Sequence, residues 1–255
     1  MLYAVCCVPV SPLRLEPSHE SEMKSQLLFG ECCKVILLEK DWVLVQCEYD
    51  EYEGWCQFSH VAEIILDNYL YGKRDLAADW INTIQYNGYP MQIPLGSSLT
   101  AMTNGKAVWK KNSIQFSGKV WEIKTSKPDT KDLRAIAFTF LNSAYLWGGK
   151  SVFGIDCSGF TQSVYKFFGI KLGRDSWQQA DGGEAIGFLQ EAKLGDLAFF
   201  DNAEGKIIHV GILLNENEII HAAGKIRVDK IDAQGVVNSE TGQRSHNLRI
   251  IKRFF

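Results

Sequence analysis

The strongest constraint on the fold is a change in the pattern of apolar residues near Asp129. Before this residue the chain consists of short β-branched and aromatic runs separated by charged turns, as in "CKVILLEKDWVLVQCEYDEYEGWCQF". After it, "DTKDLRAIAFTFLNSAYLW" carries apolar residues at helical spacing. The sequence therefore predicts β structure in its first half and a different architecture in its second.

The second half contains helices first and strands afterwards. A helical stripe follows the glycine-rich loop "GGKSVFG", and Gly169 ends it; the stripe consists of Phe160, Val164, Phe167 and Phe168. Apolar strands then run through "HVGILLN", "EIIHAA", "KIRVDKI" and "LRIIKRFF". Helices followed by an antiparallel sheet are typical of an α+β domain.

These patterns divide the chain into three predicted domains. Residues 1–66 and 67–126 are each expected to form a small β-barrel, and residues 127–255 to form the α+β domain. The two β blocks share a weak sequence pattern in which Gly30 aligns with Gly96. This similarity is consistent with two related barrels.

Composition excludes several classes of function. The chain has 255 residues and a net charge of −3, which argues against a nucleic-acid-binding protein. It has no apolar run of about 18 residues, so we expect no membrane span.

The N-terminal "MLYAVCCVPVSPLRLEP" has no basic region before its short apolar stretch, so we interpret it as a first strand and expect a cytoplasmic protein. We also expect a monomer.

Six of the seven cysteines lie in the first sixty residues. These six occupy strand-like apolar segments, and no pair has C-x-x-C spacing, while the total of seven cysteines in the chain is odd. We interpret these six as small buried hydrophobic residues in a reducing compartment.

Cys157 stands alone in "GIDCSGF", between the glycine-rich loop and a helical pattern. Asp156 can cap this helix, and the unpaired N–H groups and macrodipole at a helix start favour a thiolate. A nucleophile also needs a base, and His209 and His221 are the candidates because neighbouring antiparallel strands could place both near the thiol.

Other interpretations of these residues stay open. A lone cysteine before a helix is often buried and inert, and a histidine in an apolar strand is often a core residue. One cysteine with two histidines could bind zinc, but a structural site needs four ligands and no fourth stands at sensible spacing. The remaining histidines are expected at the surface: His19, His60 and His246.

Five ordered motifs between Asp129 and Phe255 resemble the NlpC/P60 family of cell-wall cysteine peptidases. They are D-C-S-G-F, R-D-S-x-x-Q, G-D-L-x-F-F, H-V-G-I and I-H-A. The resemblance implies a papain-like α+β fold, with Cys157 as nucleophile, His209 as base and His221 as the third polar residue. It also places Tyr145 beside the nucleophile, where its hydroxyl could stabilise the oxyanion.

The N-terminal part resembles the bacterial SH3 modules that precede this domain in γ-D-glutamyl-L-diamino acid endopeptidases. The resemblance implies a pocket for the free ammonium of an N-terminal L-Ala, formed by Glu31, Tyr52, Asp175 and Ser176. An ammonium taken out of water needs an anion and hydrogen-bond acceptors, which these side chains supply. Asp156 and Ser158, which flank the nucleophile, would contact the D-Glu and diamino acid.

The predicted function is therefore hydrolysis of the γ-D-glutamyl–diamino acid bond in short murein peptides with a free L-Ala, during recycling of wall peptides. No metal or organic cofactor is implied. Two alternatives remain: an acyltransferase that uses the same thioester, and a non-catalytic wall-binding SH3 protein.

Overall fold

A computed structural model describes residues 2–65, 74–123 and 128–255. The predicted domain boundaries at 66/67 and 126/127 lie outside these residues. The chain forms two compact units: Met1–Ile123 with Trp147–Phe153, and Lys124–Leu146 with Gly154–Phe255. No helix in the described part of the chain is long and apolar enough to cross a membrane.

The first β block of the N-terminal unit is one antiparallel sheet with the order β3-β2-β6-β5-β4-β1-β7. Side chains point to alternate faces along a strand, so every second one points into the core. In strand β5 these residues are Val43, Val45 and Cys47. The strands are β1 (Leu2–Cys6), β2 (Val10–Arg14), β3 (Met23–Leu28), β4 (Cys32–Glu39), β5 (Trp42–Cys47), β6 (Glu53–Gln57) and β7 (Val61–Ile64), and the 3-10 helix η1 (Phe58–His60) precedes β7.

The second β block is smaller and shares a core with the first. Phe29 and Ala62 of the first block pack in one cluster with Ile84 and Trp109 of the second. The block contains a four-stranded sheet of order β10-β9-β12-β11 and the separate pair β13-β8. Its strands are β8 (Leu76–Ala77), β9 (Ile81–Tyr86), β10 (Tyr89–Pro94), β11 (Lys106–Trp109), β12 (Asn112–Phe116) and β13 (Val120–Trp121). A second SH3-like barrel therefore stays a prediction.

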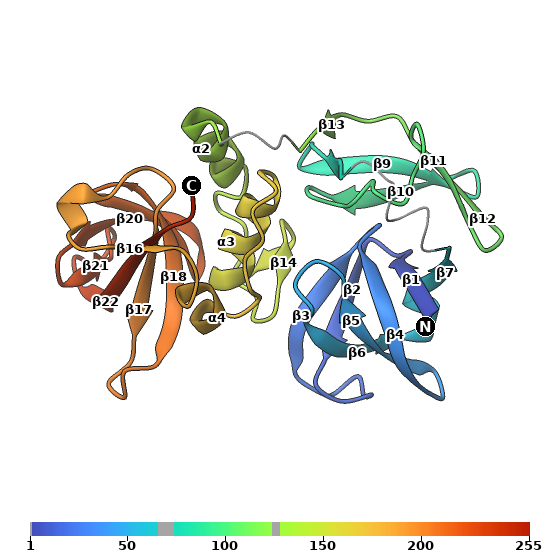
Figure 1. Cartoon of the computed structure of the whole chain (residues 1–255), viewed down its shortest axis with the longest axis horizontal. Helices are drawn as coiled ribbons and strands as arrows, with labels where there is room; N and C mark the ends of the chain where they lie inside the picture. Colours follow the sequence, from blue (N-terminus) through green and yellow to red (C-terminus); the bar gives the residue numbers. More distant parts are fainter. Residues whose placement is uncertain (1, 66–73, 124–127) are drawn as a thin grey trace. The chain divides into compact units, whose positions relative to one another are not determined.

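The helices of the C-terminal unit begin where the sequence predicts. Helix α2 (Thr130–Thr139) starts after Asp129, whose carboxylate accepts a hydrogen bond from the N–H of Lys131. Helix α3 (Cys157–Lys166) is buried along its whole length, and the short helix α4 (Ser176–Ala180) follows it. Figure 1 shows these helices along one side of the C-terminal sheet.

The C-terminal sheet closes on itself. Its order is β16-β22-β17-β18-β19-β20-β21, and β22 also pairs with β21, so six strands form a ring. The inner residues include Phe200, Leu213, Ile219, Ile231 and Val236. The strands of this sheet are β16 (Glu184–Ile186), β17 (Leu197–Asp201), β18 (Ile207–Asn215), β19 (Glu218–Ala223), β20 (Lys225–Asp232), β21 (Gly235–Val237) and β22 (Arg244–Arg253). Strand β15 (Gly154–Ile155) and the 3-10 helix η2 (Leu189–Glu191) lie outside it.

Candidate active site

Cys157 is the first residue of α3, and Asp156 caps that helix. The Asp156 carboxylate accepts a hydrogen bond from the N–H of Gly159 at 2.6 Å. The buried guanidinium of Arg174 donates two hydrogen bonds to the same carboxylate, with N–O distances of 2.7 and 3.0 Å. The start of this helix is therefore stabilised by the Arg174–Asp156 ion pair, which was not predicted from the sequence.

The predicted thiolate is wrong for the resting site. Burial raises the pKa of Cys157 to about 12, and the neighbouring Asp156 carboxylate raises it further, while backbone hydrogen bonds involving Val210 and Ser158 act in the opposite direction. The exposed fraction of Cys157 is only 7%. Because desolvation penalises the charged form, the thiol is the stable form, and a base must remove its proton.

His209 and His221 lie on the neighbouring strands β18 and β19. His221 pairs directly with Gly211, two residues beyond His209, so that all three lie on one face of the sheet. A Cβ atom at Gly211 would lie 2.8 Å from the Cβ of His221. Glycine in the H-V-G motif therefore leaves the space that the second histidine fills.

Asp229 extends this histidine pair into a relay. The His209 Nε2 and His221 Nδ1 atoms are 2.8 Å apart, and the His221 Nε2 and Asp229 Oδ2 atoms are 3.0 Å apart. An ionised carboxylate only accepts hydrogen bonds, so His221 donates from Nε2 and accepts at Nδ1. His209 must then donate from Nε2, which leaves the lone pair of its Nδ1 available to take a proton.

The surroundings of Asp229 keep it ionised. Burial alone would raise the pKa of its carboxyl group, but hydrogen bonds from His221, Ser239 and Arg227 outweigh burial and hold the pKa well below its usual range. The relay therefore ends on a fixed negative charge, which orients the two imidazole rings.

The environment of His209 keeps this base neutral. Burial lowers its pKa well below the ordinary value, and the charges of His221 and His246 lower it further. The Cys157 thiol has a backbone hydrogen bond with Val210, the residue after His209. A neutral imidazole on the same strand can act as a general base, to which the proton moves as the sulfur attacks.

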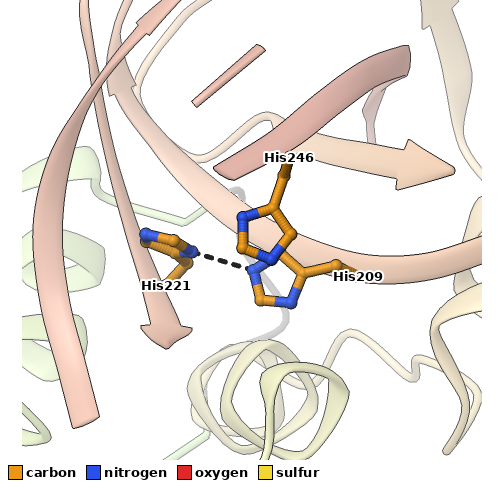
Figure 2. A group of neighbouring side chains, drawn as sticks. All are labelled: His209, His221 and His246. Carbon is orange, nitrogen blue, oxygen red and sulfur yellow. Dashed lines mark hydrogen bonds between the residues drawn. The ribbon is translucent and has the colours of Figure 1, made fainter. Parts of the chain in front are cut away.

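His246 is not the surface residue that its sequence context predicts. Its ring stacks on His209, with 4.1 Å between ring centroids and an angle of 19° between the planes. Figure 2 shows the two rings one above the other and His221 beside them. Among the described residues, these three histidines are a group that could hold a metal ion. Of the other two, His19 is exposed and His60 is half-buried and hydrogen-bonded to Ser11.

Main-chain contacts hold Tyr145 beside the segment that leads into the nucleophile. It forms a parallel bridge with Ile155, and its N–H donates to the carbonyl of Gly224, just after the strand that carries His221. Burial raises the pKa of Tyr145 to about 12, and the charges of Cys157 and Asp156 contribute. The hydroxyl therefore stays protonated and can donate a hydrogen bond.

The other predicted residues of this unit surround the helix start. Ser158 accepts a hydrogen bond from Arg174 at 3.0 Å. Asp175 is half-buried before α4, and its N–H donates to the side chain of Gln178, while Ser176 is buried at the first position of that helix.

Glu31 and Tyr52 belong to the N-terminal unit. The buried Glu31 carboxylate accepts a hydrogen bond from the N–H of Leu28 at 2.9 Å and forms an ion pair with Lys150, with an N–O distance of 3.8 Å. Lys150 also lies 4.0 Å from Asp50. It belongs to strand β14 (Lys150–Ser151), part of the Trp147–Phe153 segment, and sequence analysis assigned it no role.

Comparisons with known proteins agree with this geometry. Residues 142–245 match the NlpC/P60 family, and residues 13–61 match the bacterial dipeptidyl-peptidase SH3 domain. The gamma-D-glutamyl-L-lysine dipeptidyl-peptidase of Bacillus cereus (strain ATCC 10987 / NRS 248) is 27% identical, over 90% of this chain and 77% of its own. The protein of the same name from Bacillus subtilis (strain 168) is also 27% identical, over 82% of this chain and 75% of its own.

A solved structure shows the same fold. The crystal structure of an NlpC/P60 family protein from Bacillus cereus ATCC 10987 matches with a TM-score of 0.82 and 19% identity, over 98% of this chain and 99% of that one. Together with the sequence matches, it confirms the NlpC/P60 fold and one bacterial SH3 domain. The chain thus carries a bacterial SH3 domain and a catalytic domain of the NlpC/P60 family, and it is a hydrolase of the cysteine-peptidase type.

Proposed function

We propose that this peptidase cleaves the γ-D-glutamyl–diamino acid bond of short murein peptides that have a free N-terminal L-Ala. The observation that carries the proposal is the relay from Asp229 through His221 to His209, in the domain that also holds Cys157 at a helix start. The names of the two Bacillus relatives support the choice of a γ-D-glutamyl bond.

In the proposed reaction, Nδ1 of His209 takes the proton from the Cys157 thiol as the sulfur attacks the γ-carbonyl carbon of D-Glu. The N–H of Cys157, one of the helix-start groups without an acceptor in the helix, and the Tyr145 hydroxyl stabilise the resulting oxyanion. His209 then gives the proton to the departing amine, and water hydrolyses the thioester.

Recognition of the free amine is assigned to Glu31, Tyr52, Asp175 and Ser176, while Asp156 and Ser158 contact the D-Glu and diamino acid. Glu31 and Asp50 share one lysine, Lys150, so the three side chains carry a net charge of −1. A net negative charge suits an ammonium ligand.

The proposed setting is the cytoplasm, in the recycling of imported wall peptides. All seven cysteines are free and buried, which suits a reducing compartment. An amine pocket would also exclude intact wall strands, in which the L-Ala nitrogen is part of an amide bond.

The test compares L-Ala-γ-D-Glu-diaminopimelate with its N-acetylated form. A charge-assisted hydrogen bond contributes about 1.5–3 kcal/mol, so acetylation should lower kcat/KM about tenfold to more than a hundredfold. Glu31→Gln should narrow that gap, while Glu63→Gln, at an exposed position of the same unit, should leave it unchanged. Equal cleavage of both peptides would refute the amine pocket, and added amines that appear in the product would identify an acyltransferase.

A further inference from the structure

His246 takes no part in the relay, although its ring lies directly on the base. One ring nitrogen from each of His209, His221 and His246 lies within 4.8 Å of the other two. The three come from different strands, β18, β19 and β22, and their rings lie together, with His246 stacked on His209 and His221 beside them (Figure 2). Three convergent imidazoles are a typical ligand set for zinc and its neighbours in the periodic table.

We propose that these three histidines bind one divalent transition-metal ion such as Zn²⁺, and that the bound ion reversibly inhibits the peptidase. The ion is an inhibitor, because the proposed hydrolysis uses only the thiol, the histidine relay and water. The inference goes beyond the proposed substrate and depends only on the chain being a cysteine peptidase.

The geometry requires the His246 ring to turn out of its stack on His209. The lone pairs lie in the ring planes, and two rings that are only 19° from parallel cannot both point at one ion. Zinc–nitrogen bonds of about 2.0–2.1 Å place tetrahedral ligand atoms about 3.4 Å apart. The His209–His221 pair is at 2.8 Å and must open slightly, while the widest separation, up to 4.8 Å, must close. His246 is the half-buried member of the group, so its side chain has the most room to move.

A buried carboxylate already supports one ligand. Asp229 accepts a hydrogen bond from Nε2 of His221, which leaves Nδ1 of that ring facing His209. A carboxylate behind a metal-bound histidine fixes the ring and raises its basicity. An ion between these two rings would replace the His209–His221 hydrogen bond and bind Nε2 of His209. The single ring proton of His209 would then lie on Nδ1, which could no longer take the proton of the thiol.

The experiment measures metal binding in a background without the thiol. Cys157→Ala should bind one Co²⁺, seen by its d–d absorption, and one Zn²⁺, measured by titration calorimetry. Adding His246→Gln should weaken binding at least tenfold, and adding Asp229→Asn should weaken it about 10–100-fold. Adding His60→Gln, in the other unit, is the matched control and should change nothing.

Activity provides the second measurement. Zn²⁺ should inhibit the unsubstituted enzyme, and EDTA should restore its activity. Inhibition of His246→Gln should require at least tenfold more Zn²⁺, with circular dichroism showing that the fold is kept. The proposal is overturned if Cys157→Ala binds no Co²⁺, or if His246→Gln in that background binds as tightly as the three-histidine protein.

Discussion

Cys56 in the N-terminal unit and Cys157 in the C-terminal unit look alike by the usual measures of cysteine reactivity. Both are buried, with exposed fractions of 0% and 7%. Burial raises the pKa of each thiol to about 12. Neither is a ready thiolate, so burial and pKa do not distinguish an inert cysteine from a nucleophile.

The surroundings of the two thiols differ. Cys56 lies within strand β6, where a hydrogen bond with Ser11 is its main polar contact. Cys157 opens a capped helix in the unit whose strands carry a histidine relay that ends on Asp229. A buried thiol therefore becomes a nucleophile through a base that can remove its proton during the reaction.

The largest expected effect tests this contrast directly. Cys157→Ala should reduce kcat/KM at least about 10⁴-fold, because the covalent step is lost. Cys56→Ala, the matched change in the other unit, should keep kcat/KM and lower only the melting temperature, since it leaves a small cavity. Residual hydrolysis by Cys157→Ala close to the unsubstituted rate would remove the basis of the contrast.

Removal of the base, His209, should have the second-largest effect on activity. His209→Ala should reduce kcat about 10²–10⁴-fold, the usual contribution of general acid–base catalysis. His60→Ala, which removes a histidine from the N-terminal unit, should leave kcat within about twofold. Steady-state kinetics at saturating substrate would show the difference, and equal losses in the two variants would argue against a specific base.

The pH dependence of alkylation tests the protonation state of the Cys157 thiol. With a pKa raised to about 12, the thiolate fraction of Cys157 should rise about tenfold per pH unit between pH 7 and 9, or about 100-fold in total. Iodoacetamide labelling followed by mass spectrometry measures this rate for each cysteine. A rate for Cys157 that levels off below pH 8 would indicate a thiolate–imidazolium pair instead.

The smallest effect concerns the end of the relay. Asp229→Asn removes the charge at the end of the relay, but its amide oxygen can still accept the hydrogen bond from Nε2 of His221, so that both rings keep their tautomers. We expect kcat to fall about tenfold with little change in KM. Asp232→Asn, at a half-exposed position on the same strand, is the control and should not change kcat. Nitrogen NMR of the histidine rings would show whether the tautomers reverse.

Sequence motifs predicted the residues that are close to the nucleophile along the chain or in strand register. The D-C-S-G-F motif predicted a capped helix start at Cys157, and two histidine-containing strands predicted the pair of His209 and His221. Both predictions depend on local rules, namely capping and the alternation of side chains along strands.

Partners that depend on distant packing were missed. Asp229 is buried because of the register between β19 and β20, and "KIRVDKI" gives no sign of that burial. His246 reads as a surface residue until the strand ring closes through β22. The thiolate prediction was wrong for the same reason, since the desolvation of Cys157 depends on the whole domain.

The Trp147–Phe153 segment limits how this protein can be divided. The chain passes from one unit to the other after Ile123, after Leu146 and after Phe153. A catalytic fragment cut near residue 124 would therefore keep Lys150 but lose Glu31 and Asp50, and the Trp147–Phe153 segment would lose the rest of the unit to which it belongs. A chimera that exchanges the SH3 domain for another would meet the same obstacle, so the Trp147–Phe153 loop has to be exchanged with it.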